Sequence, residues 1–84
     1  MITEHQFKSL PEIVRKAAAD ALVMVAGEIH QRAIAKRPKM RDYEIHHEYE
    51  VARGAILSRL AAEPSGNIND YLLAARKSVS LPTL

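Results

Sequence analysis

Apolar residues recur three or four positions apart along most of this chain, which is the spacing of one side of an α-helix. The first such series predicts a long helix over about residues 10–36. Its predicted core face comprises Val14, Ala18, Ala21, Leu22, Val25 and Ile29, and Ile13, Ala17 and Met24 are expected to widen this face to one side. Glu12, Lys16, Asp20 and His30 lie on the opposite side, so the helix is predicted to be amphipathic.

Two later segments repeat this spacing and predict two further helices. The second helix is expected over about residues 43–62, with a core face of Ile45, Tyr49, Ala52, Ile56 and Leu60. The third is expected over about residues 68–78, with Ile68, Leu72, Ala75 and Val79 facing inward.

Polar residues mark where the first helices are expected to begin. Ser9 and Glu12 have the spacing of a capping box, in which each side chain accepts a hydrogen bond from a free backbone N–H. Thr3 and Gln6 form a weaker box of the same kind upstream. We expect a short helical turn there, which folds Phe7 back onto the core.

Prolines and short polar side chains divide the rest of the chain. Pro38 should end the first helix, because the residue before a proline avoids helical dihedral angles. Asp42 is placed to cap the second helix, and residues 64–66 break the chain after it. Either Asn67 or Asn69 can cap the third helix.

The link between the two long predicted helices is short, which predicts an antiparallel hairpin. The expected neighbours across it are Ile34 and Ile45, His30 and Tyr49, and Leu22 and either Ile56 or Leu57. The third helix must then cover the open side of the hairpin. We therefore expect one all-α domain over residues 1–84, in which residues 81–84 form a tail.

Composition narrows the class of protein further. The chain has no cysteine, and twelve lysines and arginines against ten acidic residues give a net charge of only +2. A dedicated DNA-coating protein is usually more basic. The N-terminus lacks the pattern of a signal peptide, and no apolar run approaches the roughly 20 residues of a membrane span. We therefore expect a cytoplasmic protein that does not enter a membrane.

Charge changes sign abruptly around Pro38. Residues 32–41 carry five cations and no acid. Residues 42–50 carry four acids and neither lysine nor arginine. The cations are Arg32, Lys36, Arg37, Lys39 and Arg41. They could bind nucleic-acid phosphates. Equally, cations at the end of one helix and anions at the start of the next compensate the helix dipoles, and this interpretation is the simpler one.

Histidines and carboxylates raise the question of a metal site. His46 and Glu50 share one helical face, and Glu44 with His47 has the spacing used in di-iron bundles. Such a site needs further carboxylates, and only Glu28 is available on the first helix. We therefore predict no metal and no other cofactor. No nucleophile motif or phosphate-binding loop occurs, so we predict that the protein is not an enzyme.

Two surfaces are candidates for binding a protein. Val23 and Ile34 are apolar but lie outside the core face of the first helix, beside His30. A second copy of the chain, forming a homodimer, or a foreign partner could cover them. The second candidate is a small, flat face on the second helix, which comprises His47, Val51, Gly54, Ala55 and Ser58, and from which we select His47, Val51 and Gly54 as the contact residues.

The expected function follows from size and from what the chain lacks. A short helical protein without catalytic motifs is typical of accessory regulators and inhibitors, such as those that phages and mobile elements encode. We expect it to bind another macromolecule, in the first instance a protein, and no small-molecule substrate. The alternative is a DNA- or RNA-binding protein that uses the basic segment Arg32–Arg41.

Overall fold

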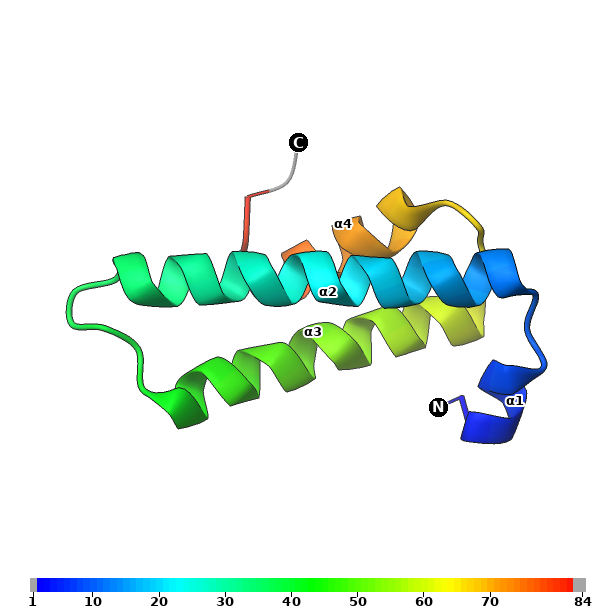
Figure 1. Cartoon of the computed structure of the whole chain (residues 1–84), viewed down its shortest axis with the longest axis horizontal. Helices are drawn as coiled ribbons and strands as arrows, with labels where there is room; N and C mark the ends of the chain where they lie inside the picture. The colour runs from blue at the N-terminus through cyan, green and yellow to red at the C-terminus, as the bar shows by residue number, and fades with distance from the viewer. Residues whose placement is uncertain (1, 83–84) are drawn as a thin grey trace.

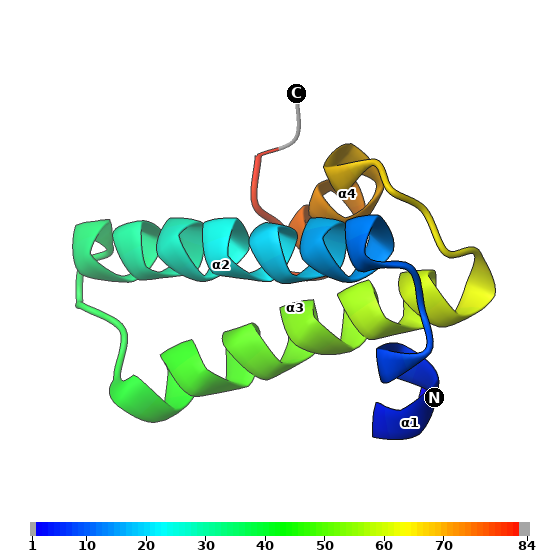
Figure 2. The same ribbon diagram turned by 45° about the vertical axis from the view of Figure 1, so that its right-hand side comes forward.

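The computed structural model describes residues 2–82, which contain four helices joined by short loops. They are α1 (Glu4–Lys8), α2 (Glu12–Ala35), α3 (Asp42–Ala62) and α4 (Ile68–Ser78), and these residues contain no strand. In Figures 1 and 2, α2 and α3 run antiparallel along the long dimension of the molecule, and α4 packs behind them. The predicted all-α class, with a hairpin and a third main helix, is confirmed.

The core lies where α2, α3 and α4 meet, because each of the three packs against the other two. The predicted core faces supply most of it: Val14, Ala18, Ala21, Val25, Ile29, Ala52, Ile56, Leu60, Leu72, Ala75 and Val79 are buried. Leu22, Ile45 and Ile68 are half-buried and pack against this cluster. Ala17 is buried as expected, but the placement of Ile13 and Met24 beside the core face is wrong: they are 67% and 45% exposed, because both lie at the outer edge of that face. Alanines buried on all three helices let the helix axes approach closely, as expected for small side chains at a helix contact.

Tyr71 is a core residue that the apolar spacing did not predict. Its side chain is fully buried, and its hydroxyl donates to the Ser65 carbonyl oxygen at 2.7 Å and accepts from the Ser65 N–H at 2.8 Å. A buried tyrosine needs such partners for its polar end. The bonds also fix the loop between α3 and α4 against the start of α4.

The residues after α4 return to the core instead of forming a free tail. The Leu81 N–H donates to the Arg76 carbonyl at 2.8 Å, and Ser80 adopts a φ of 57° in the left-handed region. These are the features of a Schellman motif, which reverses the chain at a helix end. Leu81 is thereby buried in the core cluster. Thr83 and Leu84, also assigned to the tail, lie outside the described residues.

Two of the predicted helix starts are confirmed and two are wrong. Thr3 and Gln6 form the reciprocal capping box, and the Asn67 side chain accepts from the Asn69 N–H at 3.0 Å. Ser9 does not cap α2: its hydroxyl donates to the His5 carbonyl at 2.9 Å and closes α1, so Pro11 becomes the N-cap. The Ser9–Glu12 box fails because α1 ends where that box would have to begin.

The second wrong helix start is that of α3. Arg41 occupies the N-cap position without a side-chain cap, and Asp42 is the first helical residue. A carboxylate in the first turn still interacts favourably with the helix dipole there.

The helix before this loop, α2, ends at Ala35, and Met40 is buried beneath the loop that follows. No helix among residues 2–82 is long and apolar enough to cross a membrane.

Candidate protein-binding surface

The side of α2 that faces away from α3 and α4 carries exposed apolar side chains. Val23 is 73% exposed, Met24 45% and Ile34 41%. Large apolar residues are usually buried, and several on one side of one helix form a candidate contact surface. We call this side, with Gly27 and His30, the outer α2 face. The sequence predicted Val23, His30 and Ile34 on it, and all three are exposed.

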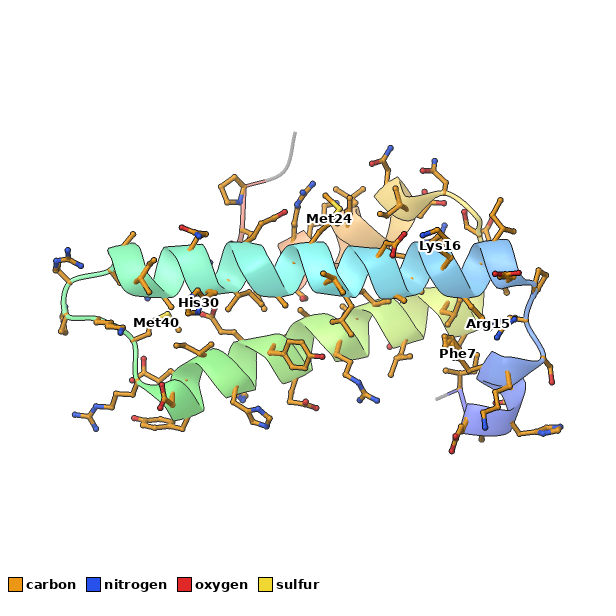
Figure 3. All side chains as sticks on the ribbon, in the orientation of Figure 1. Phe7, Arg15, Lys16, Met24, His30 and Met40 are labelled. Atoms are coloured by element: carbon orange, nitrogen blue, oxygen red, sulfur yellow. The ribbon has the colours of Figure 1, made fainter. Side chains whose placement is uncertain are left out.

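A hollow of about 730 Å³ borders the outer α2 face on the side of α4. Met24 and Gly27 form its α2 wall, and Leu81 and Pro82 form the wall opposite. In Figure 3, Met24 lies above α2, on the side where α4 packs. The sequence did not predict this hollow, since it depends on the turn at Ser80. A glycine in the middle of a long helix was the one available signal.

The charged residues that line this hollow are Glu28, Arg76 and Arg32, and each forms an ion pair within the chain, Arg32 with Glu48 of α3. Arg76 donates to both carboxylate oxygens of Glu28, at 2.8 and 2.7 Å. These hydrogen bonds hold the pKa of Glu28 below its ordinary value, against the opposing effect of burial. Because the charges in each pair neutralise each other, the hollow does not require a charged group from a partner. The hollow therefore suits an apolar side chain.

A second hollow, of about 420 Å³, lies on the other side of the outer α2 face, between α2 and α3. His30 and Tyr49 both line it, which agrees with their predicted position across the hairpin. Asp42 and His46 lie at its α3 side, so this hollow is more polar than the first. In Figure 3, His30 lies below α2, at the edge of the outer α2 face nearest to α3.

The predicted residues on α3 do not join this surface. His47 and Val51 are exposed and Gly54 is half-buried. Helical spacing puts them on the side of α3 opposite its buried residues Ala52, Ile56 and Leu60. The six predicted partner-binding residues therefore form two separate surfaces, one on α2 and one on α3.

The basic segment divides into cations used by the fold and cations left at the surface. Arg32 is tied inward: it pairs with Glu48 of α3 and donates to the Val79 carbonyl oxygen at 2.7 Å. Arg37 donates to the Ile34 and Lys36 carbonyl oxygens at 3.0 and 2.9 Å. These two bonds satisfy carbonyl groups at the end of α2, as dipole compensation predicts.

Lys36, Lys39 and Arg41 are exposed, and none forms an ion pair with another described residue. They surround a hollow of about 590 Å³ at the loop, together with Tyr43, which is 65% exposed. Of the five predicted nucleic-acid contacts, these three remain free to meet a phosphate.

Metal-binding groups are not brought together in the described part of the chain, where no three histidine or acidic side chains are placed to hold an ion. Glu28 is engaged by Arg76 and Glu48 by Arg32. The pairs on α3, His46 with Glu50 and Glu44 with His47, gain no third ligand from α2.

No protein-family model, curated protein or solved structure matches this chain. Its function is therefore argued from its own residues.

Proposed function

We propose that this protein is a non-catalytic accessory regulator or inhibitor that binds another protein through the outer α2 face. The observation that carries the proposal is the exposure of Val23, Met24 and Ile34 on one side of the longest helix, beside an apolar hollow. Burying exposed apolar area is the main source of affinity in most protein–protein contacts. The small size of the chain fits a protein that acts by occupying a surface of its partner.

The chemistry of this surface supports binding more than catalysis. Its charged pair, Glu28 with Arg76, is already satisfied within the chain. An amphipathic helix of a partner could lay its apolar side along the outer α2 face and insert one side chain into the adjoining hollow. We include a phage or mobile-element origin in this proposal because such elements encode accessory regulators of similar size, which is an argument by analogy.

Photo-crosslinking tests the proposal. With a photoreactive amino acid in place of Val23, we expect the chain to crosslink to a protein in an extract of its native host, and Val23→Glu to abolish co-purification of that protein. The matched control carries the same photoreactive residue at Val51, which is exposed on the other surface, on α3. Crosslinks from Val51 alone would move the binding surface to α3, and none from either position would contradict the proposal.

Nucleic-acid binding is the second candidate function, supported by the three surface cations around the exposed Tyr43. Cations can neutralise phosphates, and an unpaired base can stack on a tyrosine ring. We expect the combined change of Lys36, Lys39 and Arg41 to glutamate to abolish any salt-sensitive binding to single-stranded DNA or RNA, with helicity unchanged. If the unchanged protein shows no affinity for either at low salt, this function is excluded.

A further inference from the structure

The outer α2 face has a residue order that suits pairing with itself. The residues along its centre are spaced alternately four and three positions apart, so they lie on one line along the helix, and two of them, Val23 and Ile34, are large and apolar. The six central residues are Lys16, Asp20, Val23, Gly27, His30 and Ile34. The six positions are symmetric about the middle of the series. When a second copy of α2 lies antiparallel on the first, each residue therefore faces one particular residue of the other copy. Lys16 then faces Ile34, Asp20 faces His30, and Val23 faces Gly27.

We propose that the occupant of the outer α2 face is a second copy of this chain. The two α2 helices pack antiparallel, and the two-fold axis crosses them midway between Val23 and Gly27. This inference rests on the proposed function, since it names the protein that the same surface binds. A closed two-fold arrangement is the commonest form of soluble oligomer, and it buries the same surface on both copies.

Shape is the first argument for this register. Val23 is the most exposed large apolar side chain among residues 2–82, and Gly27 lies one helical turn beyond it. A Cβ added at Gly27 would have no described atom within 4 Å, so packing inside the chain does not require a glycine there. Glycine is a poor helix former, and its place in the middle of α2 needs another reason. Val23 of one copy filling the notch at Gly27 of the other supplies that reason.

Charge is the second argument, and it selects the antiparallel direction. In a parallel pair each residue would face its own copy, so that Asp20 would oppose Asp20 and Lys16 would oppose Lys16. The antiparallel pair instead places the Asp20 carboxylate opposite the exposed His30 imidazole, twice by symmetry. Among the described residues, the Asp20 carboxylate forms one ion pair, with the Lys16 ammonium group at 3.0 Å, and its half-exposed side chain leaves room for a second partner. The long stem of Lys16 can cover Ile34 while its ammonium group stays in water.

The decisive experiment measures mass in solution, by sedimentation equilibrium of the purified full chain across a concentration series. We expect the unchanged protein to be a dimer, and Gly27→Leu to raise the dimer dissociation constant by at least about tenfold, because leucine fills the notch. Helicity of the variant should be retained, since the space around Gly27 is open. Gly54→Leu is the matched control: Gly54 is also a helical glycine with no described neighbour within 4 Å of an added Cβ. It should leave the dissociation constant unchanged.

A charge exchange tests the register. Asp20→Arg and His30→Asp should each weaken the dimer, and the two changes together should restore it, because the new Arg and Asp face each other across the axis. Failure to restore would overturn this register. A monomer at every concentration, or a dimer weakened by Gly54→Leu and not by Gly27→Leu, would overturn α2 pairing. Crosslinks from Val23 to a different protein would overturn the second copy as the occupant of this face and would still support the proposed function, so the two proposals can fail separately.

Discussion

Replacing Ile56 by alanine is expected to lower the free energy of unfolding by about 2–5 kcal/mol, the usual range for removing a large buried aliphatic side chain. Ile56 is only 3% exposed and belongs to the core cluster that joins α2, α3 and α4. Truncation there removes contacts with more than one helix and leaves a cavity. A chain this short has a modest total stability, so the variant should be largely unfolded at a temperature where the unchanged protein is folded.

The measurement is chemical or thermal unfolding followed by circular dichroism. Ile13→Ala provides the matched control, because it makes the same chemical change in a helix at a residue that is 67% exposed. We expect the control to change the free energy of unfolding by less than about 1 kcal/mol. A melting temperature of Ile56→Ala equal to that of the control would show that the helices do not pack as described.

The helices and most of the core could be predicted from the sequence because their signal repeats many times. A core face of five or six residues at helical spacing is insensitive to one misassigned position, and Val25, Ile29, Ile56 and Leu60 are buried as expected. Each helix end, in contrast, depends on a few groups that compete locally. Ser9 could cap α2 or close α1, and no periodic signal decides between them.

The candidate site could be predicted only in part, for a related reason. Val23 and Ile34 could be assigned to the outer side of α2 from helical spacing alone, and both are exposed. The hollow beside them could not, because Leu81 and Pro82 reach it through a left-handed turn at Ser80, a residue type that rarely adopts one. Helical spacing gives the direction of a side chain and says little about what a distant loop places beside it.

Arg32 is the clearest case of a residue whose role depends on distant partners. The sequence places it in a basic segment, yet its guanidinium group bonds to Glu48 and to the carbonyl oxygens of Val79 and Ser80, the last two at 2.7 and 3.3 Å. These partners lie on α3 and at the end of α4. We therefore expect Arg32→Met to lower the free energy of unfolding by about 2–3 kcal/mol, because a partly buried carboxylate and two carbonyl groups lose their donor.

Lys36→Met is the matched control, since it removes an exposed cation of the same segment and should change stability by no more than about 0.5 kcal/mol. A double-mutant cycle with Glu48→Leu isolates the ion pair from the carbonyl contacts. We expect a coupling free energy of about 1–2 kcal/mol between Arg32 and Glu48, as for residues in one hydrogen-bond network. A coupling free energy of zero, or equal losses of stability from Arg32→Met and Lys36→Met, would show that Arg32 is a surface cation like Lys36. That result would support a role for Arg32 in nucleic-acid binding. A loss confined to Arg32 would leave that function to Lys36, Lys39 and Arg41 alone.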